Sequence, residues 1–304
     1  MFDIRTLIGR EEEMTDITQL LSSEKRVVLV HGIGGIGKTF LCQHLYKQLK
    51  NTYTYIGWFE YIENLQTTFT SQVDDDFFHL NDITNTGERW GIIIDKLQSL
   101  DSDTIIFIDD IKNTRDQDTY LSVLTNLNIT IIATSRLRFD TSLFTHYPLD
   151  ILSPEACLSL FYTYYDLEKN DEYAHNIITL AGCHSLTVEL LARTAQNSCT
   201  ELKDFYEVLH QKGFDIKDIV SESVATFWHD EKKKKHFLDH LVKVFDLAGL
   251  SDTEITILKK LSLCGPVPVG KILVKQWLDL KSLDRINELV KKGWLISYGK
   301  ELFL

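Results

Sequence analysis

The segment Val27–Leu45 constrains the fold of this chain more than any other stretch. It runs from four consecutive apolar residues, VVLV, through HGIGGIGKT into the helix-like FLCQHL. The pattern G-x-x-x-x-G-K-[ST] of a phosphate-binding loop is satisfied by Gly32, Gly37, Lys38 and Thr39. A buried strand before the loop and a helix after it are the context that this pattern requires, and they disfavour the alternative of a flexible glycine turn. We predict a polyphosphate site here.

The residue types of the loop match that chemistry. Glycine accepts backbone dihedrals closed to other residues, which lets successive amide N–H groups turn inward around a polyphosphate. The glycines expected to do so are Gly32, Gly34, Gly35 and Gly37. The following helix adds its positive N-terminal end. We expect Lys38 to reach the β- and γ-phosphates and the Thr39 hydroxyl to hold Mg²⁺.

A second stretch, Thr104–Ile111 (TIIFIDDI), places two aspartates at the end of an apolar run. Such a run predicts a strand buried on both faces, and its acids fall at the carboxyl edge of a parallel sheet, where open α/β sheets bind ligands. Downstream of a phosphate loop, this is a Walker B arrangement. We expect Asp109 to hold Mg²⁺ through water and Asp110 to orient or deprotonate a water attacking the γ-phosphate.

Another strand is predicted at Ile129–Thr134, and Arg136 follows it at the same sheet edge. A guanidinium there can sense the γ-phosphate bidentately; the alternative is a surface arginine that caps the strand. A further strand, His146–Leu152, is expected to close the sheet. Helical stretches at Tyr120–Leu127 and Gly87–Leu100 alternate with the strands, which predicts a doubly wound parallel sheet with helices on both faces.

Three adjacent acids, Asp74 to Asp76, lie in a polar segment between a predicted strand at Tyr53–Tyr61 and the helix at Gly87–Leu100. They could form a metal site. Adjacent carboxylates in such a segment more often form a solvated turn or a helix start, and we favour that interpretation.

Strand patterns stop at Ser153. Ser153, Pro154 and Glu155 are suited to the N-cap and first turn of a helix. Further helices are predicted at 172–180, 185–196 and 201–211, which together indicate a small bundle. Near the end, Ser251–Glu254 fits a capping box. It opens a set of three helices followed by two short strands about Gly299, typical of a winged helix. We therefore divide the chain into domains at 1–152, 153–215 and 216–304.

Composition narrows the class further. With 304 residues, 44% of them hydrophobic, the chain can bury a full core. The net charge of -12 argues against broad binding to DNA or an anionic membrane, and the run Lys232–Lys235 fits a solvated face better than a nucleic-acid contact. No stretch has the length of a membrane span, no signal peptide is recognisable, and five scattered cysteines indicate reduced thiols. We expect a cytoplasmic protein.

Several motifs occur together and in order: IGRE (8–11), GIGGIGKT, IIFIDDI, TSR (134–136), LSPEACLSLF and GCHSLTVELLA. This ordered set resembles the STAND class of P-loop ATPases, of the NB-ARC type, which includes apoptotic ATPases, plant resistance proteins and bacterial defence proteins. The resemblance covers essentially the whole chain. It implies a nucleotide-binding domain, a helical domain and a winged-helix domain, with ATP/ADP and Mg²⁺ as ligands.

The resemblance also implies roles for single residues. Arg10, in IGRE, would lie near the adenine, and Arg136 would be the sensor arginine. Where the family has a proline that contacts adenine and ribose, this chain has Ser185, which puts that contact in question. The family's winged helix usually contributes a histidine to the β-phosphate of ADP just after a strand resembling GKELFL, and this sequence stops at Leu304 with no such residue. We therefore expect an excised module whose sensor or effector regions lie elsewhere.

The function that the resemblance implies is a signalling switch. ADP would hold a closed monomer, and ATP, hydrolysed slowly, would favour an open form that self-associates. The defence proteins of the family suggest a role against phage or pathogens. One alternative is an ATP-dependent winged-helix transcription regulator, although the predicted recognition helix 283–291 has a weak basic face, and we do not expect DNA binding. The other is a scaffold that holds ADP without hydrolysing it, which the pair Asp109 and Asp110 disfavours.

Overall fold

The computed structural model describes residues 6–21, 26–114, 116–137, 144–167, 169–198, 201–212, 250–261, 269–291, 294–298 and 300–303. Two compact units make up the chain. The first comprises Met1–Ile33, Lys38–Leu149 and Lys291–Gly293, and the second comprises Gly34–Gly37, Asp150–Val290 and Trp294–Leu304. The run Lys232–Lys235 lies outside the described residues, as does Gly299.

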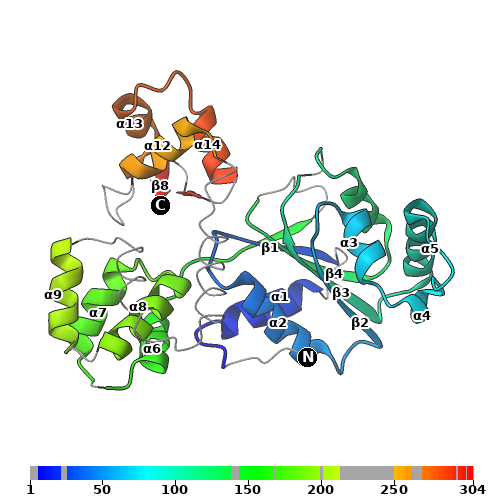
Figure 1. Cartoon of the computed structure of the whole chain (residues 1–304), viewed down its shortest axis with the longest axis horizontal. Helices are drawn as coiled ribbons and strands as arrows, with labels where there is room; N and C mark the ends of the chain where they lie inside the picture. Colours follow the sequence, from blue (N-terminus) through cyan, green and yellow to red (C-terminus); the bar gives the residue numbers. More distant parts are fainter. Residues whose placement is uncertain are drawn as a thin grey trace. The chain divides into compact units, whose positions relative to one another are not determined.

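A five-stranded sheet forms the centre of the first unit (Figure 1). Its strands are β1 (Val27–His31), β2 (Tyr55–Glu60), β3 (Thr104–Ile111), β4 (Thr130–Ser135) and β5 (Thr145–Pro148). They lie in the order β2-β3-β4-β1-β5, and every neighbouring pair is parallel. The predicted α/β fold with a parallel sheet is confirmed.

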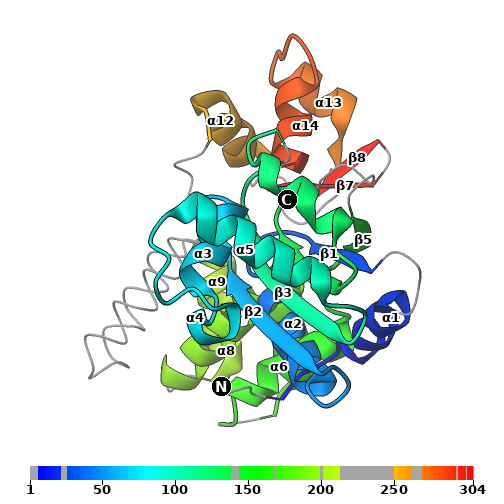
Figure 2. The same cartoon turned by 90° about the vertical axis from the view of Figure 1, so that its right-hand side faces the viewer.

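Helices cover both faces of this sheet (Figure 2). They are α1 (Glu11–Leu21), α2 (Lys38–Leu49), α3 (Leu65–Gln72), α4 (Asp75–Phe78), α5 (Thr86–Ser99) and the 3₁₀ helix η1 (Thr119–Asn126). Alternation along β3 explains the two faces: Ile106 and Ile108 pack into a core with α3 and α5, whereas the ring of Phe107 meets Tyr46 of α2. A strand buried on both faces needs the continuous apolar run that the sequence shows.

Two predicted elements differ in detail. The last strand of the sheet ends at Pro148 and not at Leu152, because Pro148 pairs with His31, at which its partner β1 ends. The stretch predicted as a helix at 120–127 is the 3₁₀ helix η1, whose first turn is capped by the Asp118 carboxylate, 3.1 Å from the amide nitrogen of Tyr120.

The second unit contains a helical bundle with its own core. Its helices are α6 (Pro154–Tyr164), α7 (Asp171–Leu180), α8 (Ser185–Ser198) and α9 (Leu202–Lys212). The core is built around Phe161, Tyr165 and Ile177, all almost fully buried. Ser153 caps α6 as predicted, because its side chain accepts from the amide of Ala156, and Pro154 occupies the first turn. The helical region expected after the sheet is therefore present.

The C-terminal part has the elements of a winged helix. They are α12 (Asp252–Leu261), β6 (Val269–Gly270), α13 (Lys271–Trp277), α14 (Asp284–Lys291), β7 (Ile296–Tyr298) and β8 (Glu301–Phe303). The strands form an antiparallel sheet in the order β6-β8-β7, and a separate apolar core includes Val274, Ile286 and Leu302. The capping box is confirmed, since the Ser251 amide donates to the Glu254 carboxylate over 2.7 Å. The pattern did not predict β6, which has only two residues.

Among the described helices, none combines the length and the apolar character needed to cross a bilayer.

Candidate functional site

The phosphate loop lies between β1 and α2, as the sequence predicts. β1 is buried along most of its length, and α2 begins at Lys38 directly after the loop. Two of the loop glycines, Gly35 (φ +75°) and Gly37 (φ +105°), have left-handed backbone that other residues rarely adopt. The two remaining glycines of the motif, Gly32 and Gly34, do not have positive φ in the structure. The left-handed backbone therefore requires glycine at Gly35 and Gly37, in the second half of the loop.

Lys38 is bent back onto the loop. Its side chain is buried, and Nζ donates to the carbonyl oxygens of Gly32 (2.9 Å) and Ile33 (2.8 Å). Burial lowers the pKa of Lys38 to about 8, and the positive charge of Arg136 acts in the same direction, while Asp110 and Asp109 oppose it. The ammonium group is therefore mostly charged at neutral pH but close to its titration range.

Asp109, on β3, receives two hydroxyl groups on one carboxylate oxygen. Thr39 Oγ1 donates to Asp109 Oδ1 over 2.9 Å, and Thr134 Oγ1 donates to the same atom over 2.6 Å. Burial raises the pKa of Asp109, and the two hydrogen bonds act against this shift. The pair of Thr39 and Asp109 supplies neighbouring oxygen atoms of the hard type that Mg²⁺ prefers, so these residues fit that metal.

Asp110 has strained backbone, with φ at +60°. The pairing of β3 with β4 shifts register between Ile108 and Ile111, and the Asp110 amide donates to Thr134 Oγ1 over 2.8 Å in place of a ladder bond. Its carboxylate lies 3.5 Å from Lys112 Nζ in an exposed ion pair. A left-handed non-glycine residue costs about 1–3 kcal/mol, and such strain clusters at functional sites.

Thr134 is a residue to which the sequence alone assigned no role. It donates to Asp109 and accepts from Asp110, so one hydroxyl orients both acids. It is almost fully buried at the end of β4, two residues before Arg136. Its position in the sequence could have identified it. The parallel strands β3 and β4 end at the same edge of the sheet, and a buried hydroxyl near the end of a strand needs a polar partner there.

Arg136 and Arg10 are the two arginines predicted for the site. Arg136 is half-buried just beyond β4, near enough to Lys38 to lower its pKa. Arg10 precedes α1, and only 5% of its surface is exposed, so it is a buried residue and not a surface arginine. Its Nη1 lies 2.5 Å from Glu13 Oε1. The structure thus brings Arg136 to the edge that carries Lys38 and Asp109, and keeps Arg10 buried at the start of the first helix.

Ser185 is the first residue of α8 in the second unit. Its hydroxyl donates to the carbonyl oxygen of Ile36 over 3.2 Å. Ile36 lies in the segment Gly34–Gly37, which belongs to the same unit as α8. The preceding residue, His184, also contacts this segment: its Nε2 lies 2.8 Å from the carbonyl oxygen of Gly34. His184 is a second residue whose contact with the loop the sequence did not predict.

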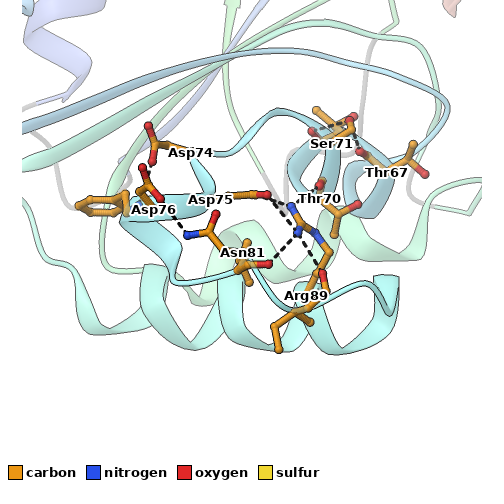
Figure 3. A network of polar contacts seen from close by, with 12 residues as sticks. Thr67, Thr70, Ser71, Asp74, Asp75, Asp76, Asn81 and Arg89 are labelled. Atoms are coloured by element: carbon orange, nitrogen blue, oxygen red, sulfur yellow. Dashed lines mark hydrogen bonds and ion pairs between the residues drawn. The ribbon is translucent and has the colours of Figure 1, made fainter.

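The acids at 74–76 form a helix start, as favoured. Asp74 caps α4, Asp75 binds Arg89, and Asp76 accepts from Asn81 over 2.8 Å (Figure 3). The Arg89 guanidinium also donates to the carbonyl oxygens of Thr70, Leu80 and Ile83 at 3.1 to 3.3 Å. Arg89 therefore ties α3, α4 and α5 together. Within the described ranges, no group of three or more His, Cys, Asp or Glu side chains is arranged to hold a metal ion.

Comparison with known proteins agrees with the class that this geometry defines. The family model described as AAA ATPase domain matches residues 6–80, which contain β1, the phosphate loop and α2. This match covers well under half of the chain and supports a P-loop ATPase domain that binds ATP. No curated protein matches the sequence.

Among solved structures, the Walker-type ATPase of Pyrococcus abyssi is 12% identical with a TM-score of 0.63, over 98% of this chain and 93% of that one. This similarity concerns the fold alone. A Signal Transduction ATPase with Numerous Domains (STAND) protein with a tetratricopeptide repeat sensor, from Pyrococcus horikoshii, is 19% identical with a TM-score of 0.48. That match covers 99% of this chain but 41% of the STAND protein, so the chain spans less than half of its length. Orc1 of Aeropyrum pernix in complex with DNA is 15% identical, over 98% and 89%, with a TM-score of 0.48.

Proposed function

We propose that this chain is the nucleotide-operated switch of a larger signalling protein, with slow ATP hydrolysis controlling self-association. One observation carries the proposal. Lys38, Thr39 and Asp109 meet at the carboxyl edge of the parallel sheet, and Arg136 follows the neighbouring strand within electrostatic reach of Lys38. These are the groups needed to bind a triphosphate with its metal and to distinguish it from a diphosphate.

In this proposal each group of the edge has one task. The loop amides and Lys38 bind the β- and γ-phosphates, for which Lys38 exchanges the carbonyl oxygens of Gly32 and Ile33 for phosphate oxygens. Thr39 and Asp109 would hold Mg²⁺, because they offer the oxygen ligands that this metal prefers. When bound there, the metal would supply positive charge that offsets the charge developing on the phosphates during hydrolysis.

Asp110 is the proposed base for the attacking water. Its carboxylate is 43% exposed, so it can reach a water molecule, and Thr134 fixes its backbone in the strained conformation. Arg136 would contact the γ-phosphate with its two parallel N–H groups, an interaction that ADP cannot make. Hydrolysis would therefore remove the Arg136 contact and return the switch to its ADP state.

Arg10 and Ser185 are the proposed contacts at the nucleoside end. Both proposals rest on the resemblance of their motifs, IGRE and GCHSL, to those of STAND ATPases. Arg10 is held by Glu13, and Ser185 by the Ile36 carbonyl oxygen. A serine offers adenine and ribose less apolar surface than a proline, so we expect weaker nucleotide retention than the family pattern implies.

The switch requires more than one input. Moving a two-state equilibrium from 1:99 to 99:1 needs a difference in affinity of about 5.5 kcal/mol between the two states. A single contact between Arg136 and a γ-phosphate supplies about 1.5–3 kcal/mol as a charge-assisted hydrogen bond. A sensor region of the larger protein would provide the remainder.

The proposal is tested by identifying the nucleotide that the purified chain releases on denaturation, and by titrating the nucleotide-free chain with ATP while measuring its mass in solution. We expect ADP in the purified protein and an ATP-dependent increase in mass. ADP that is retained without turnover or assembly would favour a scaffold, and an assembly that forms only with DNA would favour a transcription regulator. A chain that binds neither ATP nor ADP would contradict all three.

A further inference from the structure

Every carbonyl oxygen of the phosphate loop from Gly32 to Ile36 accepts a hydrogen bond. Lys38 Nζ occupies the first two. The other three are taken by the start of α8, through His184 Nε2 to Gly34 (2.8 Å), the Leu186 amide to Gly35 (3.3 Å) and Ser185 Oγ to Ile36 (3.2 Å). These three contacts lie within one compact unit. The shortest of them is made by His184, a residue to which the proposed chemistry gives no task.

The turn before α8 fixes the position of His184. Gly182 (φ +57°) and Cys183 (φ +52°) are both left-handed, and the chain reverses there between α7 and α8. The His184 carbonyl oxygen accepts from the Val188 amide over 2.9 Å, so His184 is the residue that caps α8. The backbone of His184 is therefore fixed at the start of α8, and its ring is held by separate contacts of its two nitrogen atoms.

The second ring nitrogen of His184 fixes its tautomer. Thr187 lies beside Nδ1, with its hydroxyl oxygen at 3.0 Å and its amide nitrogen at 3.4 Å. Because the Thr187 amide can only donate, Nδ1 acts as the acceptor, and in the neutral ring Nε2 then carries the proton. That N–H is the group that donates to Gly34.

Holding a carbonyl oxygen also orients the next amide. In a trans peptide the C=O of one residue and the N–H of the next point in opposite directions. The bonds to the carbonyls of Gly34, Gly35 and Ile36 therefore direct three N–H groups away from α8, namely those of Gly35, Ile36 and Gly37. Successive N–H groups pointing to one side form a concave anion site.

We propose that His184 is a positioning residue for phosphate binding: its Nε2–H holds the Gly34 carbonyl so that the loop amides face the phosphates. This inference rests on the proposed function. It gives Gly35 a further task, since a Cβ at this position would come within 2.8 Å of His184 Cε1 and displace the imidazole. Because a residue of the helical bundle orients the loop, the free energy of phosphate binding is linked to the state of that bundle.

The test compares two substitutions of His184 in the 304-residue chain. H184F keeps a ring of similar size but removes the donor, whereas H184Q retains an N–H donor at a similar reach. The matched control is H175F, which makes the same change at an exposed histidine of α7. For each protein, ADP and inorganic pyrophosphate are titrated into the nucleotide-free chain by calorimetry, and its free energy of unfolding is measured separately.

We expect H184F to weaken ADP and pyrophosphate binding by about tenfold or more, because the loop loses an oriented donor. H184Q should remain within about threefold of the unmodified chain, and H175F should equal it. A merely structural role would lower stability in H184F and H184Q alike without separating their affinities. Equal ADP affinity in H184F and the unmodified chain would overturn the inference while leaving the switch intact, whereas an unmodified chain that binds no ADP would refute the proposed function itself.

If H184F does not fold, a double-mutant cycle of G35A and H184A tests whether His184 acts on the loop. G35A should weaken ADP binding more in the unmodified chain than in an H184A background, because part of its effect is the collision with the imidazole. A G35A effect that is the same in both backgrounds would show that His184 and the loop act independently, and would overturn the inference.

Discussion

Adjacent aspartates occur twice in the first unit, and their environments differ. Asp109 and Asp110 lie near the end of the strand β3, share the hydroxyl of Thr134 and lie beside Lys38. Asp74 to Asp76 open a short helix, where they cap it or bind Arg89 and Asn81. The same residue type thus forms a strained end of a sheet strand in one place and the capped, hydrogen-bonded start of a helix in the other. The preceding element decides which, because a buried strand delivers its last residues to the ligand-binding edge of the sheet.

The largest expected contrast concerns hydrolysis. D110N should lower the ATPase rate by about 10²- to 10⁴-fold, the usual contribution of a general base, while ADP affinity stays within about twofold. D76N, the same change in the surface network, should leave the rate unaltered. Phosphate release under saturating Mg-ATP measures both. An unchanged rate in D110N would show that this acid is not the base.

The next contrast separates stability from binding. R89M should lower the free energy of unfolding by about 3 kcal/mol, because it removes an ion pair and leaves three carbonyl oxygens without their donor. ADP affinity, measured well below the unfolding transition, should not change. Urea denaturation of the nucleotide-free chain gives the first quantity. A loss of ADP affinity in R89M without loss of stability would place Arg89 in the nucleotide site instead.

Replacing one acid of each group by asparagine should shift the free energy of unfolding in opposite directions. D75N should destabilise the chain by about 1–2 kcal/mol at pH 7, since the Arg89 guanidinium loses its charged acceptor. The raised pKa of Asp109 means that the folded chain holds this proton more tightly than the unfolded chain. The folded state is therefore penalised as pH rises through that pKa, so D109N should be more stable than the unmodified chain at pH 7.

Well below the ordinary aspartate pKa of 3.8, the carboxyl is protonated in both the folded and the unfolded state, so this gain from D109N should vanish there. Urea denaturation at pH 7 and at about pH 3 tests this expectation. A D109N protein that is less stable at pH 7 would show that the hydroxyl bonds from Thr39 and Thr134 outweigh the burial of the charge.

The smallest expected effect is a pH dependence of ADP binding. Lys38 titrates near pH 8 in the nucleotide-free chain, and bound phosphates favour its charged form. ADP affinity should therefore fall about tenfold between pH 7 and pH 9, with uptake of a proton on binding. K38R should bind more weakly but lose this dependence, since arginine stays charged. K47R, at an exposed position of the same helix, should follow the unmodified curve.

Much of the fold follows from local patterns. Apolar runs identify β1 and β3, and the capping residues Ser153 and Ser251 begin α6 and α12 where predicted. Short elements escape such reasoning. β6 has two residues, too few for any periodicity, and forms because β8 pairs with it. Likewise, the difference between an α-helix and the 3₁₀ helix η1 depends on tertiary packing.

The sequence predicted which residues form the candidate site, but not their backbone conformations or their contacts with distant segments. The motifs name Lys38, Thr39 and Asp109, and parallel topology brings them to one edge. The left-handed backbone of Asp110 and the contact between His184 and Gly34, which are 150 positions apart, leave no trace in local sequence because each is imposed by partners from distant segments. The roles of the site residues therefore remain predictions that the experiments above address.

The two hydroxyl groups on Asp109 bear on the order in which ligands arrive. Thr39 and Thr134 both donate to Oδ1, so a cation approaching alone must compete with hydrogen bonds that already stabilise the carboxylate. Mg²⁺ chelated by a nucleotide brings its own phosphate ligands and needs little from the protein. We therefore expect weak affinity for free Mg²⁺, and a chain that senses the cellular pool of metal-complexed nucleotide and not the concentration of the metal itself.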